Sequence, residues 1–177
     1  MQFPESAFWH YSTQIWTLPN VESTCLYLQD EFDISANILL YSCWAGDQQL
    51  CLNDDDLQIL LDTIKPWQNI ITPLRDSRKM MRQNLIALPS SMVKQTLENI
   101  NEMELNAEHM AQLALEKALD LKQLTSCPDR TSADCCYANL NAYLQTLDNV
   151  SLDDALSSKI NQLLSAVYPD TPLSQCQ

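Results

Sequence analysis

Glycine is almost absent from this sequence. Its 177 residues include only Gly46, where an average protein of this length has about 12 glycines. β-Sheet proteins use glycine in tight hairpins, and phosphate-binding loops use it where the backbone approaches the ligand. A single glycine therefore argues against a β-rich fold and against glycine-loop nucleotide sites. Gly46 follows an apolar segment and is predicted to end a helix there.

Catalytic motifs are missing as well. The only histidines are His10 and His109, and neither belongs to a His-Glu-x-x-His or Glu-x-x-His pattern. There is no Gly-x-Ser-x-Gly nucleophile motif. A general base at one of the histidines stays open as an alternative. The sequence favours a protein that is not an enzyme and that has no catalytic residue, metal site or cofactor.

Positive charge is scarce. Ten Lys and Arg residues face 23 Asp and Glu residues, which gives a net charge of −13. Such a surface repels a phosphate backbone, so binding to double-stranded nucleic acid is not expected. The acidity fits a basic partner, or it serves only to keep the protein in solution.

Targeting signals and metal-type cysteine spacing are also lacking. The seven cysteines include no Cys-x-x-Cys pair, and an odd number fits reduced thiols. If oxidised, Cys127 is expected to bridge to Cys135 or Cys136. The N-terminus has no basic-then-apolar signal pattern, and the longest apolar region, 34–45, is too short to span a bilayer. These features predict a cytoplasmic protein without a membrane span.

The pattern of apolar residues and caps predicts an all-α fold. We expect a single orthogonal or bundle-like domain of about seven to nine helices and no sheet. Residues 1–124 are predicted to form the core, and 125–177 a two-helix extension packed on it, with a loose tail after 168. The expected helices span about 4–17, 21–31, 34–45, 54–64, 66–87, 91–124 (as one helix or two), 132–147 and 151–167.

Capping residues and prolines set these boundaries. Asn20, Asp33 and Asn53 are expected to cap the helices that follow them, as are Thr131 or Ser132 and then Ser151. Pro66 is predicted to start a helix, and Pro73 to kink or split it.

The first candidate site is a polar cluster, formed by Gln29, Asp30, Asp33 and Asn37. Acidic clusters on helices can hold magnesium, but such sites normally use two aspartate-rich motifs that face one apolar cavity. Only one cluster is evident here. The alternative is a network of caps and hydrogen bonds between two helices.

The second candidate is a basic stripe, formed by Arg75, Arg78, Lys79 and Arg82. These four residues share one helix face, at positions i, i+3, i+4 and i+7. The stripe could bind an acidic partner, a phosphate or RNA. Alternatively, it pairs with the chain's own carboxylates, such as Glu104 and Glu108 on the next helix.

The third candidate is aromatic. Trp9 and Trp67, together with Trp16 and Trp44, either fill the core or line a groove that accepts a partner helix or an apolar ligand. Trp9 and Trp67 are the candidates for partner contact.

A longer pattern resembles a known family. The chain is similar to an uncharacterised proteobacterial family catalogued as domain of unknown function 2390, over roughly residues 8–115. The matching residues are Phe8-Trp9, Tyr11-Ser12, Pro19-Asn20-Val21, Cys25-Leu26, Leu28-Gln29-Asp30, Asp33, Asn37-Ile38-Leu39-Leu40, Cys43-Trp44, Pro66-Trp67, Ile70-Ile71, Pro73-Leu74-Arg75, Arg78, Lys79 and Glu104-Leu105-x-Ala107-Glu108.

The resemblance implies a bacterial, cytoplasmic, mostly helical protein and supplies no activity. The family tends to have glycine at two places where this chain has Asn20 and Phe32.

Together these features predict a non-enzymatic interaction protein, an adaptor or regulator whose partner is another protein. It would use the basic stripe or a groove near the tryptophans. The alternative is a helical ligand-binding protein or magnesium-dependent enzyme with an apolar cavity near Asp30–Asn37. Pathway and oligomeric state do not follow from the sequence.

Overall fold

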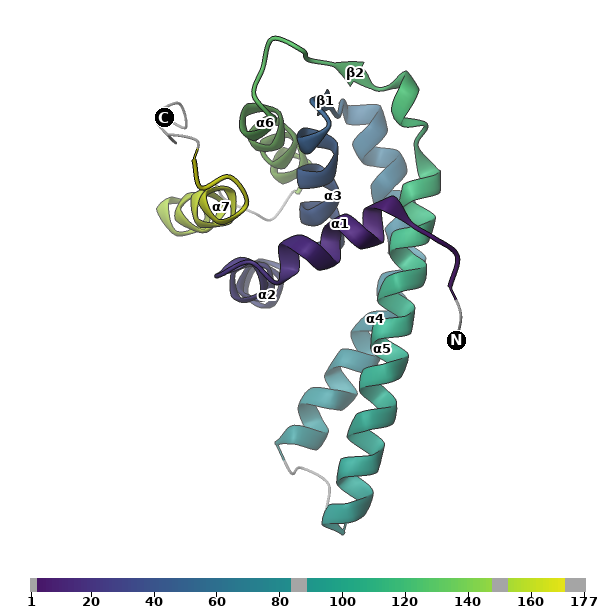
Figure 1. The fold of residues 1–177 in the computed structure, drawn as a ribbon. Coiled ribbons are helices and arrows are strands. Elements are labelled where there is room, and N and C mark those ends of the chain that lie inside the picture. Colours follow the sequence, from purple (N-terminus) through teal and green to yellow (C-terminus); the bar gives the residue numbers. More distant parts are fainter. Residues whose placement is uncertain (1–2, 84–88, 148–152, 171–177) are drawn as a thin grey trace.

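The computed structural model describes residues 3–83, 89–147 and 153–170, and most of these residues are helical (Figure 1). The prediction of an all-α fold is confirmed. The helices are α1 (Ala7–Trp16), α2 (Val21–Phe32), α3 (Ala36–Asp47), α4 (Asp54–Arg82), α5 (Ser90–Ala118), α6 (Ser132–Gln145) and α7 (Asp154–Val167), with a short 3₁₀ turn at Leu121–Gln123.

One small correction concerns the expected absence of a sheet. β1 (Leu50–Cys51) and β2 (Thr125–Ser126) pair antiparallel, with Leu50 opposite Ser126. Each strand has two residues, so the pair acts as a tie between two connections rather than as a layer. It joins the α3–α4 connection to the α5–α6 connection.

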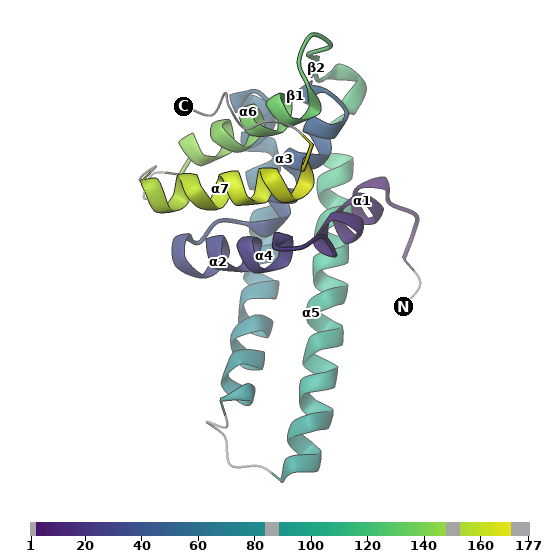
Figure 2. The ribbon, with the colours of Figure 1, turned by 60° about the vertical axis from the view of Figure 1, so that its left-hand side comes forward.

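The helices form two parts: a body of α1, α2, α3, α6 and α7, and a long hairpin of α4 and α5. α4 and α5 run side by side, and the half of this hairpin nearest their connection extends beyond all the other helices (Figures 1 and 2). α1 packs against α5 and α3, α6 packs against α3, and α7 packs against α2. No helix of the described residues is long and apolar enough to cross a membrane.

The centre of the body is α3. Every residue from Asn37 to Gly46 is buried, so this helix is surrounded by its neighbours. Phe8 of α1, Leu57 of α4 and Leu140 of α6 are fully buried in the same apolar core. α6 therefore packs directly on the helix at the centre of the core, although it lies outside the region of family resemblance.

Gly46 does not end a helix, contrary to the prediction. It lies inside α3, and no glycine has a positive φ. A Cβ atom at this position would lie 2.5 Å from the backbone N and Cα of Cys136 on α6. The position therefore needs glycine because two helices cross there with their backbones nearly in contact.

The prediction that Pro66 starts a helix is wrong, and α4 is not split at Pro73. Pro66 and Pro73 lie inside α4, which is one continuous helix. Each proline removes one helical hydrogen bond, but the long contact with α5 stabilises the helix against that local cost. On the other side of the hairpin, α5 answers the open question about 91–124: it is a single helix that ends at Ala118.

Several caps differ from the predicted ones. Asp33 ends α2 rather than capping α3, whose N-cap residue is Ser35. Asn20 precedes α2 but makes no side-chain capping bond. Both Asn20 and Asp33 are left-handed, with φ of 70° and 55°, and left-handed backbone favours glycine. The glycine typical of the resembled family at Asn20 agrees with this geometry, whereas Phe32, the other such position, is the last helical residue of α2.

At the remaining helix starts, the outcome is mixed. Asn53 and Thr131 form full capping boxes at α4 and α6, as the sequence predicts for these positions. α1 begins after Ser6, not at Pro4, and α7 is capped by Asp153. Ser151 and the tail from residue 171 onward lie outside the described residues.

Candidate functional site

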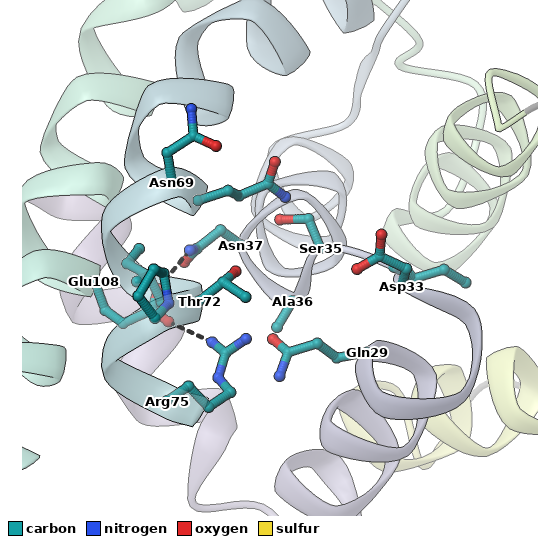
Figure 3. A pocket seen from close by; sticks show the side chains of 13 residues that line it. Gln29, Asp33, Ser35, Ala36, Asn37, Asn69, Thr72, Arg75 and Glu108 are labelled. Atoms are coloured by element: carbon teal, nitrogen blue, oxygen red, sulfur yellow. Dashed lines mark hydrogen bonds and ion pairs between the residues drawn. The ribbon is translucent and has the colours of Figure 1, made fainter. Parts of the chain in front are cut away.

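The polar cluster and the basic stripe, which are far apart in the sequence, lie together in the structure. Arg75 donates to Glu108 Oε1 at 2.9 Å, and Asn37 Nδ2 donates to Glu108 Oε2 at 2.6 Å (Figure 3). Nearby, Lys79 Nζ lies 2.8 Å from Asp30 Oδ1. The helices α2, α3, α4 and α5 thus contribute to one site.

The hydrogen bonds continue from this site to α1. Gln112 Nε2 donates to Asn37 Oδ1 at 2.9 Å, and Ser12 Oγ donates to Gln112 Oε1 at 2.5 Å. Ser12, Asn37 and Gln112 are all buried. A buried amide without a partner costs about 1–3 kcal/mol, so each member of this chain fixes the orientation of the next.

In the other direction the network ends in a two-bond ion pair. Arg78 Nε and one terminal nitrogen donate to the two oxygens of Glu104, at 2.6 and 3.0 Å. Arg75 Nε lies 3.5 Å from the same carboxylate. The side chains of Arg75 and Glu104 are only 15% and 13% exposed, so water screens these charges weakly.

Lys79 and Asp30 behave differently, because their side chains are 45% and 44% exposed. An ion pair that is so open contributes at most about 1 kcal/mol. Three of the four residues of the basic stripe therefore pair with the chain's own carboxylates. The fourth, Arg82, forms no ion pair with any residue that the structure describes.

Burial changes the acidity of this site. It raises the pKa of Glu108, and the bond from Asn37 and the charge of Arg75 oppose that rise. The hydrogen bonds to Glu104 raise the pKa of Arg78. The Arg78 guanidinium therefore keeps its charge at all working pH values, whereas burial makes the Glu108 carboxyl easier to protonate.

Two hollows meet at this network. One, of about 360 Å³, lies beside Gln29, Ser35 and Asn69 (Figure 3). The other is a larger groove of about 630 Å³ between α1, α2 and the α4–α5 hairpin. We call it the tryptophan groove. Its apolar lining residues are Trp9, Trp16, Leu26, Ala36, Leu40 and Leu105, and its charged ones are Glu22, Arg75, Arg78, Arg82, Glu104 and Glu108.

The tryptophan groove has an apolar wall that reaches the surface. Leu26 and Leu105 are 37% and 58% exposed. Trp9 is fixed by stacking on His109, with ring centroids 3.9 Å apart and planes at 7°. Gln29 borders both hollows, and its buried Nε2 has no acceptor among the described residues. The groove thus offers rigid apolar surface beside one free hydrogen-bond donor.

The other predicted residues are placed less centrally. Asp33 borders the smaller hollow, and Lys79 lies at the mouth of a further depression beside Asp30. Trp67 is half-buried against the core and borders none of these hollows. Within the part of the chain that is described, no three His, Cys, Asp or Glu side chains gather in a way that could hold a metal ion.

Ser12 and Gln112 are site residues that the sequence did not reveal. Ser12 lies in an aromatic helix, and Gln112 follows Glu108 by one helical turn on a face rich in alanine. The only sequence signal is this i, i+4, i+8 series of Glu104, Glu108 and Gln112 on a helix. Its partners are set by how α1 and α3 dock on α5, which no local pattern encodes.

The fold and this site define an all-α protein whose helices are joined by an internal polar network beside an open apolar groove. A family model described as "Protein of unknown function (DUF2390)" matches residues 7–115, more than half of the chain. The protein belongs to this family. No curated protein and no solved structure matches the chain.

Proposed function

We propose that this protein is a non-enzymatic interaction protein, and that its tryptophan groove binds an amphipathic helix of a partner protein. The observation that carries the proposal is the groove itself, which is lined by residues of all five helices from α1 to α5 and has Leu26 and Leu105 exposed and Trp9 half-buried in its wall. A helix laid in a groove uses such an apolar wall for its own apolar face. We also propose that it acts in the cytoplasm.

The charge balance favours a partner helix that is basic outside its apolar face. Inside the groove the three arginines and three glutamates balance, so the groove does not by itself select an anion. The whole chain carries a charge of −13. A basic partner would therefore be attracted over a distance and held by apolar contact in the groove, and its binding would weaken with salt.

Gln29 adds a polar contact to this picture. Its free Nε2 is suited to a carbonyl oxygen of the bound segment, because an acceptor there would satisfy a buried donor. The paired arginines support the walls of the groove rather than reaching out to a ligand. This differs from the simplest interpretation of the basic stripe, in which the arginines themselves contact an acidic partner.

The test uses a synthetic Leu/Lys amphipathic helix as the probe and its scrambled sequence as the reference. Binding is followed by intrinsic tryptophan fluorescence. Leu105→Glu is expected to weaken binding roughly tenfold, because it places a charge in the apolar wall. Met103→Glu is the matched control: it is on the same helix and equally exposed, at 57%, but outside the groove.

The proposal would be overturned if the helical and scrambled probes bound equally well, or if Leu105→Glu and Met103→Glu lost the same amount of affinity. Either result would show that only bulk charge attracts the probe. The same two variants applied to affinity purification from cells give a second measurement. A partner that is lost with Leu105→Glu and retained with Met103→Glu supports the proposal. A small apolar dye that occupies the groove and is not displaced by the helix would favour the ligand-binding alternative.

A further inference from the structure

Two pairs of thiols lie where the C-terminal part of the chain packs on α3 and β1. Cys127 Sγ lies 2.6 Å from Cys51 Sγ, and Cys136 Sγ lies 3.3 Å from Cys43 Sγ. The members of each pair are 76 and 93 positions apart in the sequence. The fold therefore brings these thiols together, and their spacing in the chain does not predict it.

The backbone holds the first pair in place. Cys51 belongs to β1, which pairs with β2 immediately before Cys127. The amide of Cys127 donates to the carbonyl of Gln49 at 2.8 Å, which extends the pairing by one further bond. Cys127 therefore meets Cys51 rather than Cys135 or Cys136, the partners expected from sequence spacing, and Cys135 is a further thiol beside Cys51.

The two pairs differ in their access to solvent. Cys51 and Cys127 are half-buried, whereas Cys43 and Cys136 are 0% exposed at the crossing of α3 and α6. A small oxidant in solution can reach the first pair while the protein is folded and cannot reach the second. The molecule thus contains a reactive pair and a shielded pair for comparison.

We propose that Cys51 and Cys127 are a reversible oxidation site, at which peroxide converts the two thiols to a disulfide. This goes beyond the interaction function and does not depend on it. A reducing compartment would keep the site as thiols at rest, and a peroxide pulse would close it.

The disulfide forms in two steps. The thiolate of Cys127 attacks one peroxide oxygen, the O–O bond breaks, and a sulfenic acid forms as hydroxide takes up a proton to give water. Cys51 then attacks the sulfenic sulfur, the S–O bond breaks, a second water leaves and the S–S bond forms. The two thiols lose two electrons, and the peroxide is reduced to two waters. A dithiol reductant reverses the bond by exchange.

The environment of Cys51 fits the second step. Burial, and then the neighbouring Cys127 thiol, raise the pKa of Cys51 to about 12, so it is protonated at neutral pH and is a poor first nucleophile. Once Cys127 is oxidised, Cys51 can react with it despite being a weak nucleophile, because the two sulfur atoms already lie close together.

Closing this bond would enclose the whole α4–α5 hairpin, because α4 starts after Cys51 and α5 ends before Cys127. A loop of this length restricts the unfolded chain strongly. The oxidised protein is therefore expected to melt about 10 °C higher than the reduced one.

The experiment treats the full chain, carrying Cys176→Ser, with hydrogen peroxide, blocks free thiols and maps peptides by mass spectrometry. A Cys51–Cys127 cross-linked peptide with a loss of two hydrogens is expected, with Cys43 and Cys136 blocked only after unfolding. Cys51→Ser or Cys127→Ser should abolish the cross-link, and Cys135→Ser should leave it in place. Dithiothreitol should remove both the cross-link and the gain in melting temperature.

A cross-link from Cys127 to Cys135, or recovery of Cys51 and Cys127 as separate oxidised or blocked residues, would overturn the proposal. The map on the parent protein decides this even if a serine variant fails to fold, and circular dichroism identifies such a variant. Peptide binding in the tryptophan groove is measured on the reduced protein, so failure of one proposal leaves the other unaffected.

Discussion

The contact between α3 and α6 and the contact between α4 and α5 hold the molecule together by different means. Around α3, ten consecutive residues, Asn37–Gly46, are buried, and the closest approach is made possible by a glycine. In α4, by contrast, only five of 29 residues are buried, and its contact with α5 includes arginine–glutamate pairs as well as apolar residues of the core. The first contact is close-packed, whereas the second adds charge pairs to apolar packing.

This difference indicates which changes each region tolerates. A close-packed crossing has no room for added atoms, because the clash there is with backbone that cannot rotate away. A polar contact loses most when one partner is removed and the other stays buried without it. Removing both partners together can be far less harmful.

The largest expected effect is at the glycine crossing. Gly46→Val should lower the free energy of unfolding by roughly 4 kcal/mol or more, because its side chain would overlap the backbone of Cys136. Chemical denaturation measures this loss. Asp47→Ala, at an exposed neighbouring position, should change stability by less than about 0.5 kcal/mol. A stable Gly46→Val protein would show that α3 and α6 can move apart.

The second effect concerns the charged contact. Glu108→Ala should cost about 2 kcal/mol, since Arg75 and Asn37 both lose their acceptor. Glu108→Leu should destabilise for the same reason, and adding Arg75→Met to it should recover part of that loss, which a double-mutant cycle of Glu108→Leu and Arg75→Met by denaturation would detect. Glu102→Ala on the exposed face of α5 is the control. Additive losses would mean that the pair does not act as a unit.

The smallest effect is a pH dependence at the contact between α1 and α5. Burial, and then the nearby His10, lower the pKa of His109 below 6.5, so the folded protein prefers the neutral ring. Its contribution is present above the unfolded-state pKa and is lost progressively as the pH falls from that value through the lower folded-state pKa. His109→Phe keeps an aromatic ring on Trp9 and should reduce the loss of stability between pH 7.5 and 5.5. An identical pH profile would contradict this.

Local sequence patterns predicted most helices correctly, but they failed at positions where one helix packs on another. Asn53 and Thr131 start helices as expected, because an N-cap depends only on the next three residues. Gly46 and Pro66 were misassigned because distant packing decides both: one position accommodates α6, and the other is supported by α5.

The candidate site shows the same limit. The sequence identified Arg75, Arg78 and Asn37 as unusual, and it offered Glu104 and Glu108 as partners because the next helix was expected to follow closely. It treated the polar cluster and the basic stripe as separate candidates, whereas Glu108 connects them. The contribution of Ser12 depends on the docking of α1, which is a property of the assembled fold.

The burial of α3 under α6 also affects synthesis of the chain. The two helices meet through residues 93 positions apart. At a translation rate of about 5–20 residues per second, α3 therefore leaves the ribosome roughly 5–20 s before α6. During that interval an apolar helix that includes Ile38 and Leu39 is exposed on the nascent chain. The newly made protein must therefore rely on chaperones, or on provisional packing against α1 and α2, until translation reaches α6.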